Sequence, residues 1–136
     1  MALVIDASVA LTWCFASEAT PETDEVLQEV LRTGATVPAL WHVELANILS
    51  RAGRLGRIDA AGVDGFFSRL DCLSISTDAP AVEVQRTAVL RLVRRFGLTA
   101  YDAIYLELAQ RLGGTLATLD EDLRAAAVGC GITCVP

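Results

Sequence analysis

Two aspartates stand where short runs of strand-forming residues end. Asp6 follows the β-branched pair Val4-Ile5, and Asp120 follows the run Thr115-Leu116-Ala117-Thr118-Leu119. The carboxyl ends of parallel strands meet at one edge of an open α/β sheet, where such sheets bind their ligands. We therefore expect both carboxylates at that edge, with the hydroxyl of Ser8 beside Asp6 supporting it.

Glu44 occupies an unusual position on a predicted helix. Its neighbours three and four residues away are Leu40, Trp41 and Ile48, so it lies on the apolar face. A carboxylate buried without a partner costs several kcal/mol or becomes protonated, so an arginine, a metal ion or water in a cleft is expected to compensate it. A structural ion pair is the simpler alternative. Asn47 is a second polar residue on nearly the same face.

Helix capping offers a structural explanation for the remaining acids. In LTAYDAIYLELAQ, Thr99 can cap a helix whose third residue is Asp102. In TLATLDEDL, Thr118 and Glu121 form the better capping pair, and this leaves Asp120 free to bind a ligand.

The four acids together suggest a metal site. Two aspartates at strand ends and two acids in the first halves of helices would meet at one edge of a parallel sheet. Such a cluster cannot stay ionised without cations, because like charges raise one another's pKa. Carboxylate oxygens without histidine or cysteine nearby favour Mg²⁺ or Mn²⁺ over zinc. The predicted ligands are Asp6, Glu44, Asp102 and Asp120.

Short apolar strands alternate with helices along the chain, which indicates an α/β fold with a mainly parallel sheet of about five short strands, covered by helices on both faces. No linker or repeat interrupts residues 1–136, so one domain is predicted. The expected strands are 2–6, 35–37, 72–76, 115–118 and 132–135. The expected helices are 8–15, 21–33, 38–54, 59–70, 80–95, 100–112 and 120–128.

The charged residues are unevenly distributed. The net charge is −6, which argues against a nucleic-acid partner, but all 11 basic residues are arginine and several are clustered. They either complement helix C-termini or form a rim that contacts phosphate. The absence of lysine excludes receiver domains and P-loop proteins, and Ser8 stands where a haloacid-dehalogenase-type phosphatase needs its second aspartate. The two clusters are Arg51, Arg54, Arg57 and Arg91, Arg94, Arg95.

The remaining composition indicates a globular protein of the cytoplasm. Hydrophobic residues make up 53% of the chain, enough for a substantial core. No apolar run approaches the ~18 residues that span a bilayer, and the N-terminus lacks the features of a signal peptide. The cysteines lack zinc-site spacing, so buried free thiols are expected at Cys14, Cys72, Cys130 and Cys134.

The acidic motifs resemble those of a known family. Asp6-x-Ser8 after a first strand, ELANIL around Glu44, LTAYDA around Asp102 and TLDEDL around Asp120 are together similar to a PIN-domain ribonuclease, in particular a VapC-type toxin of a toxin–antitoxin pair. The resemblance spans the whole chain in order. It implies a PIN-like three-layer fold, the four acids as metal ligands, and Ser8 as a supporting hydroxyl.

That resemblance implies a metal-dependent endoribonuclease. One or two Mg²⁺ ions, or Mn²⁺, would activate a water for in-line attack on RNA and leave 5′-phosphate and 3′-hydroxyl ends. Plausible substrates are tRNA or rRNA. A small antitoxin and a second copy of the chain are the implied protein partners, and no membrane is involved.

Two other functions stay open at this stage. One is a non-catalytic PIN scaffold that binds RNA or protein, against which the intact set of four acids argues. The other is a DNA-acting nuclease of the same superfamily, for whose additional elements 136 residues leave little room. His42, the single histidine, is not expected to act as a general base, and Asn47 has at most a supporting role. The roles of Thr118 and Asp122 are not assigned.

Overall fold

The computed structural model describes all residues, 1–136, and contains one sheet of five strands. Every strand pair is parallel, and the spatial order is β3-β2-β1-β4-β5. The predicted α/β fold with a parallel central sheet is thus confirmed. The strands are β1 (Leu3–Ile5), β2 (Ala35–Pro38), β3 (Ile75–Asp78), β4 (Thr115–Ala117) and β5 (Cys134–Val135).

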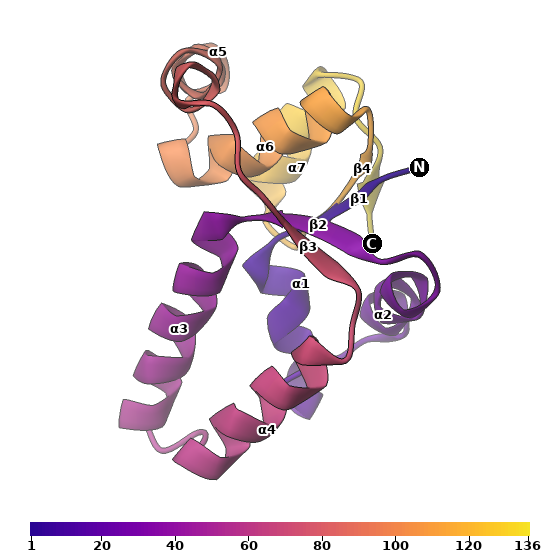
Figure 1. Ribbon diagram of the computed structural model, residues 1–136, viewed down its shortest axis with the longest axis vertical. Helices are drawn as coiled ribbons and strands as arrows, with labels where there is room; N and C mark the ends of the chain where they lie inside the picture. The colour runs from indigo at the N-terminus through magenta and orange to yellow at the C-terminus, as the bar shows by residue number, and fades with distance from the viewer.

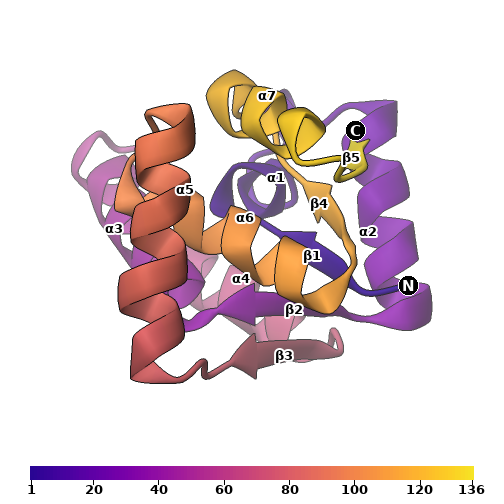
Figure 2. The same cartoon turned by 90° about the horizontal axis from the view of Figure 1, so that it is seen from above.

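Helices cover both faces of the sheet. In the view of Figure 1, α5, α6 and α7 lie above the sheet and α1 to α4 lie below it; Figure 2 shows α6 crossing the sheet with α5 beside it. The helices are α1 (Ala7–Thr12), α2 (Pro21–Thr33), α3 (Ala39–Arg54), α4 (Ala60–Asp71), α5 (Val89–Phe96), α6 (Ala100–Leu112) and α7 (Glu121–Gly129). Two short segments are the 3₁₀ turn η1 (Ala16–Glu18) and the π-helical segment η2 (Val84–Ala88), which leads into α5.

The order of the strands creates a switch point between β1 and β4. From β1 the chain moves outward to β2 and β3 with its connections on one face, then returns to β4 and β5 through helices on the other face. Right-handed crossovers require this change of face. The neighbouring strands β1 and β4 pair through Leu3 with Thr115, Val4 with Leu116 and Ile5 with Ala117. Open α/β sheets bind ligands just beyond such a switch point.

Local sequence signals account for several helix ends. Thr20 and Thr23 form a reciprocal capping box at the start of α2, with Pro21 at its first position. Helices α5 and α6 end at Gly97 and Gly113, whose φ angles of 66° and 60° lie in the left-handed region that favours glycine.

Three predicted elements differ by three residues or more from their bounds in the structure. The strand predicted at 72–76 is β3, Ile75–Asp78, because α4 extends to Asp71 and the N–H of Cys72 still bonds to its last turn. The helix predicted at 8–15 ends at Thr12. The helix predicted at 80–95 becomes regular α-helix at Val89, after the π-helical segment.

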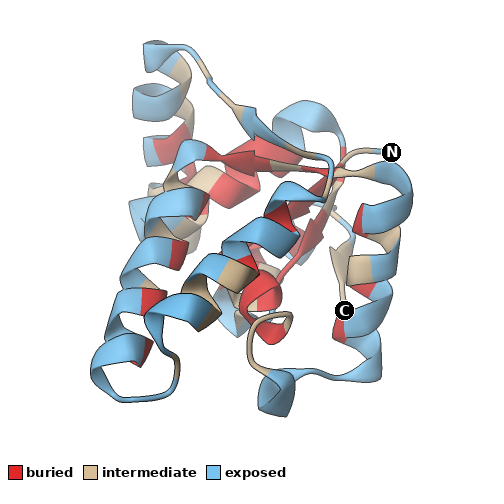
Figure 3. Cartoon of the chain, turned by 60° about the horizontal axis from the view of Figure 1, so that its bottom comes forward, coloured by how far each residue is buried: buried red, intermediate tan, exposed pale blue.

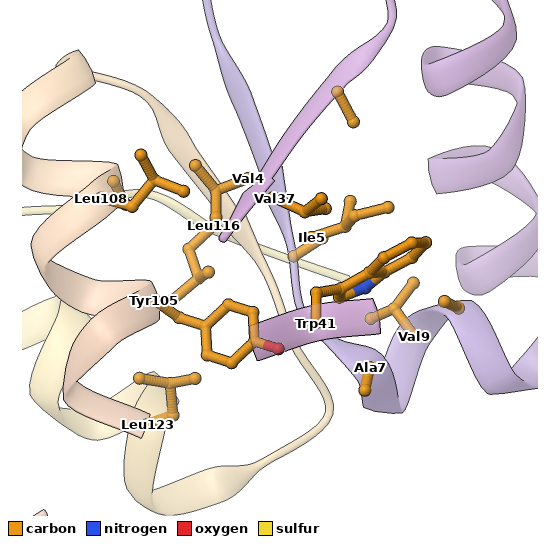
Figure 4. Packing of buried hydrophobic residues seen from close by; sticks show 14 of the residues in the cluster. Val4, Ile5, Ala7, Val9, Val37, Trp41, Tyr105, Leu108, Leu116 and Leu123 are labelled. Carbon is orange, nitrogen blue, oxygen red and sulfur yellow. The ribbon is translucent and has the colours of Figure 1, made fainter. Parts of the chain in front are cut away.

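The core lies between the sheet and its helices. In Figure 3 the buried residues follow the central strands and the inner sides of the helices, whose outer sides are exposed. Figure 4 shows Trp41 of α3 and Tyr105 of α6 packed against Val4, Ile5 and Leu116 of the sheet. No helix combines the length and the hydropathy that a membrane crossing requires.

The prediction of buried cysteines is wrong. All four thiols are free, but Cys72 is exposed and the other three are only partly buried. Cys72 follows the last turn of α4, outside the core, where its thiol donates to the carbonyl of Ser68.

Candidate active site

Asp6 follows β1 at the switch point and is held by several hydrogen bonds. Its side chain is buried, with 6% of the residue exposed, and accepts hydrogen bonds from the hydroxyls of Ser8 and Thr118. It also caps α1 by accepting from the backbone N–H of Val9 at 3.2 Å. Burial raises the pKa of Asp6, and these hydrogen bonds partly offset that rise. Asp6 is therefore both a helix cap and a fixed carboxylate.

The two hydroxyls beside Asp6 link β1 to the segment after β4. Ser8 Oγ donates to Asp6 and accepts from the backbone N–H of Leu119 at 2.9 Å. Thr118 Oγ1 donates to the other Asp6 oxygen and accepts from the backbone N–H of Asp120 at 3.0 Å. Each hydroxyl thus uses its donor on the carboxylate and an acceptor position on the backbone. Ser8 lies where the sequence predicted a supporting hydroxyl.

Asp120 has a different local role from the one predicted. Thr118 is buried and turned toward Asp6, so it does not cap α7. Asp120 itself is the N-cap of α7 and accepts from the backbone N–H of Leu123 at 2.8 Å. The prediction that Thr118 and Glu121 form the cap is wrong, because Thr118 serves the buried carboxylate instead. Asp120 nevertheless lies at the same sheet edge as Asp6.

Glu44 projects from α3 and is half-buried. The hydroxyl of Tyr105, on α6, donates to its Oε1, and Figure 4 shows that hydroxyl directed toward α3. Burial raises the pKa of Glu44, the hydrogen bond from Tyr105 lowers it, and the charges of Asp6 and Asp102 raise it again. Burial and the neighbouring acids also raise the pKa of Tyr105, so the phenol remains a donor. The partner that the structure shows for Glu44 is thus a hydroxyl, whereas the sequence predicted an arginine, a metal ion or water.

Asp102 is the third residue of α6, as predicted. Thr99 caps this helix by accepting from the backbone N–H of Asp102 at 3.2 Å. Burial raises the pKa of the Asp102 carboxyl, and the charges of Asp120, Asp6 and Asp122 raise it further. The helix cap and the electrostatic link to the other acids therefore coexist at this residue.

The four predicted acids come from four different elements and act on one another electrostatically. None of them forms an ion pair with an arginine. Their oxygen donors, and the raised pKa values of Asp6, Glu44 and Asp102, match the chemistry that Mg²⁺ or Mn²⁺ requires. No three such side chains lie close enough together to enclose an ion in this structure. The fit to a metal therefore rests on donor type and charge.

Two further residues contribute to the site. Tyr105 lies one helical turn after Asp102, on the same face of α6. This spacing alone could have predicted that Tyr105 lies near the site. Thr118 lies two residues before Asp120 but reaches Asp6 across the strands, and no local pattern shows that. Asp122, on the first turn of α7, is exposed and shares a surface hollow with Asp102.

Two candidates on the long helix form no hydrogen bond with the four acids. His42 is exposed, and its Nε2 lies 2.8 Å from the hydroxyl of Thr77 on β3. Asn47 is exposed, whereas Glu44 one turn earlier is half-buried.

Comparison with known proteins gives the class of this chain. Residues 3–129 match the PIN domain family, so the chain belongs to that family. Over 87 residues it is 38% identical to Exonuclease VapC9 from Pyrobaculum aerophilum, an alignment that covers 63% of this chain and 62% of VapC9. The match thus spans less than two thirds of that relative. The predicted resemblance to VapC-type PIN proteins is confirmed.

Solved structures share the fold. PAE2754 from Pyrobaculum aerophilum superposes with a TM-score of 0.71 at 27% identity, over 98% of this chain and 83% of that chain. FitAcB from Neisseria gonorrhoeae gives a TM-score of 0.65 over 98% of this chain and 96% of that chain. At 15% identity the second likeness concerns the fold alone.

Proposed function

We propose that this protein is a metal-dependent endoribonuclease and the toxin of a toxin–antitoxin pair. The observation that carries the proposal is the group of four acids at the switch point, without an arginine partner and with three raised pKa values. Membership of the PIN family and the similarity to Exonuclease VapC9 support a nuclease. The proposed ligands of Mg²⁺ or Mn²⁺ are Asp6, Glu44, Asp102 and Asp120.

In the proposed mechanism, some residues would bind the metal ions and others would orient those ligands. Ser8 and Thr118 hold Asp6 in one orientation, and Tyr105 holds Glu44. Asp102 and Asp120, at the starts of α6 and α7, present half-buried carboxylates to the same edge. One or two bound ions would supply positive charge for the phosphate and lower the pKa of the attacking water. Fixing the acids beforehand reduces the cost of ordering them during the reaction.

Cleavage of structured RNA tests the proposal. Purified protein is incubated with tRNAs and ribosomal RNA fragments in Mg²⁺ or Mn²⁺, with EDTA and with the Asp6→Asn variant as controls. Cleavage that needs the metal and Asp6 is expected. Cleavage that survives EDTA or the substitution contradicts the mechanism, and no cleavage across the panel favours a non-catalytic scaffold.

The name of the relative favours an exonuclease as second candidate. VapC9 is called an exonuclease, whereas we propose internal cleavage for this chain. A circular RNA has no ends, so only an endonuclease can open it. Comparing a circular RNA with its linear form separates the two: linearisation of the circle supports the proposal, and digestion of the linear form alone supports exonuclease activity.

The protein partners follow from the same proposal. A VapC-type toxin in the cytoplasm would be bound by a small cognate antitoxin, and the chain would form a homodimer. Co-expression with the product of an adjacent small reading frame should give a stable complex in which RNA cleavage is suppressed. The mass of the free protein in solution tests the dimer.

A further inference from the structure

The two arginine clusters differ in their surroundings. Arg57 pairs with Glu18 at 3.2 Å and lies over the ring of Phe15, and Arg54 donates to Ser50. The segment formed by η2 and α5 carries four exposed arginines, none of which has an ion-pair partner. These four, here called the α5 arginines, are Arg86, Arg91, Arg94 and Arg95.

The clusters also differ in their position relative to the acids. Arg54 is ten residues after Glu44 on α3, which is about 15 Å along a helix axis. Figure 1 shows that α3 runs away from the sheet, so its C-terminal end is remote from the switch point. Helix α5, in contrast, ends at Phe96, and only Gly97 to Thr99 separate it from α6 and Asp102.

A surface hollow at the end of α5 reaches Asp102, one of the four acids. It has a volume of about 400 Å³, and its lining includes Phe96, Asp102 and Asp122. The guanidinium of Arg95 lies 4.7 Å from the centre of the ring of Phe96, which lines this hollow. An aromatic ring and an arginine are the groups that bind a stacked base and its phosphate in single-stranded nucleic acids.

The arginines beyond the hollow continue away from the core. Val89 and Leu92 are buried against the protein, and Arg91, Arg94 and Arg95 occupy the opposite side of α5. Unpaired arginines so close together repel one another, and the negative phosphates of a polyanion relieve that repulsion. The counterions that the polyanion releases make such binding dependent on salt. The net charge of the chain is −6, so positive charge is concentrated in few places, and the α5 arginines are one of them.

From this geometry we infer that single-stranded RNA next to the scissile phosphate crosses the Phe96 hollow and follows the α5 arginines, and that the arginines of α3 do not contact it. This inference rests on the proposed function and adds the path of the substrate. Arg95 and Phe96 make the first contact beyond the acids. Arg94 and Arg91 contact the phosphates that follow.

A matched pair of double variants tests the path. Arg94→Gln/Arg95→Gln and Arg51→Gln/Arg54→Gln each remove two exposed charges from the last turn of a helix. Both are made in the Asp6→Asn background, and binding of a labelled single-stranded RNA is measured from 50 to 200 mM salt without divalent metal. The affinity falls as salt rises, and each lost phosphate contact makes the slope of log affinity against log salt shallower by about 0.7.

We expect this slope to become shallower by about 1.4 in Arg94→Gln/Arg95→Gln and to stay unchanged in Arg51→Gln/Arg54→Gln. Equal changes in both variants, an unchanged slope in the α5 variant, or no salt-dependent RNA binding by the Asp6→Asn protein would overturn the inference. Cleavage by the otherwise wild-type protein is assayed separately. Salt-dependent binding along α5 without metal-dependent cleavage would refute the proposed function and leave the path standing, whereas cleavage that Arg94→Gln/Arg95→Gln does not weaken would refute the path alone.

Discussion

Two acidic regions of this protein differ in whether a positively charged side chain pairs with their carboxylates. Glu107, on α6, is buried with 6% exposed, and Arg111 one turn later bonds to it at 2.7 Å and to Asp78 of β3 at 2.6 Å. Those partners raise the pKa of the Arg111 guanidinium. Asp102, five residues before Glu107 on the same helix, has only other acids as charged neighbours. The two carboxylates therefore share a helix but not an electrostatic environment.

The difference separates structural acids from the candidate functional acids. At the contact between α6 and β3, the chain supplies Arg111 as the cation for the buried carboxylate of Glu107. At the switch point it supplies hydroxyls and backbone N–H groups, which orient a carboxylate without neutralising it. An external cation would neutralise the acids at the switch point, whereas Glu107 and Asp78 already have Arg111 as their cation. Burial of an acid alone does not distinguish the two, but the chemistry of its partners does.

The largest expected effect is on catalysis at the unpaired region. Asp102→Asn should reduce RNA cleavage about 1000-fold, on the order of 4 kcal/mol of transition-state stabilisation, because one proposed metal ligand is lost. Glu107→Gln is the matched control, the same acid-to-amide change on the same helix, and should keep cleavage within a few-fold. Rates of RNA cleavage under saturating metal measure both. Equal losses in the two variants would remove the distinction between the regions.

The paired region should instead determine stability. Arg111→Met leaves Glu107 and Asp78 without their cation and should lower the free energy of unfolding by about 2 kcal/mol, a value reduced because the arginine is partly exposed. Arg111→Met/Glu107→Leu replaces the buried pair with apolar groups and should recover much of that loss. Urea unfolding measures both. A double variant less stable than Arg111→Met would contradict the assignment of a structural ion pair.

Removing the hydroxyl next to Glu44 should have a smaller effect. Tyr105→Phe deletes the donor that lowers the pKa of Glu44, so that pKa should rise and the acid limb of the pH–rate profile should move to higher pH. The rate at neutral pH should fall about tenfold, as for other residues that orient a metal ligand. Tyr101→Phe, a change to an exposed tyrosine of α6, is the control. An unmoved acid limb would exclude this role for Tyr105.

The smallest effect should be on the pH dependence of stability without metal. Asp6, Glu44 and Asp102 have raised pKa values in the folded protein, so the folded state holds their protons more tightly than the unfolded state does. Their contribution to stability is fully present below the ordinary values of 3.8 and 4.5 and is lost as pH rises through the raised values. Asp102→Asn should flatten this decline in thermal unfolding measured in EDTA. A steeper decline in the variant would contradict the pKa direction.

The parts of the fold and site that were predictable depend on local or periodic signals. An aspartate directly after a β-branched run predicts a strand end, and Glu44 is conspicuous because apolar residues surround it on its helix. Thr99 and Thr20 predict the starts of α6 and α2, because threonine favours the N-cap position of a helix. These signals need no knowledge of tertiary contacts.

The errors occurred where a tertiary contact overrides the local choice. Thr118 could cap α7, but the buried Asp6 takes its hydroxyl, so Asp120 becomes the cap. The alternation after Cys72 suggests a strand, yet α4 and its final turn extend that far and displace β3 to Ile75. The pairing of Glu44 with Tyr105 joins two residues that are 61 positions apart in the sequence, so no short pattern reveals that they are partners.

Metal binding to the metal-free protein tests the central claim most directly. Thermal unfolding is followed as Mn²⁺ or Mg²⁺ is added to wild type, Asp102→Asn and Glu107→Gln. The account predicts stabilisation of wild type and Glu107→Gln by about 2.7 kcal/mol at about 100 times the dissociation constant, and little or none in Asp102→Asn. Equal stabilisation of all three proteins, or none in wild type, would contradict the claim that the unpaired acids form the cation site.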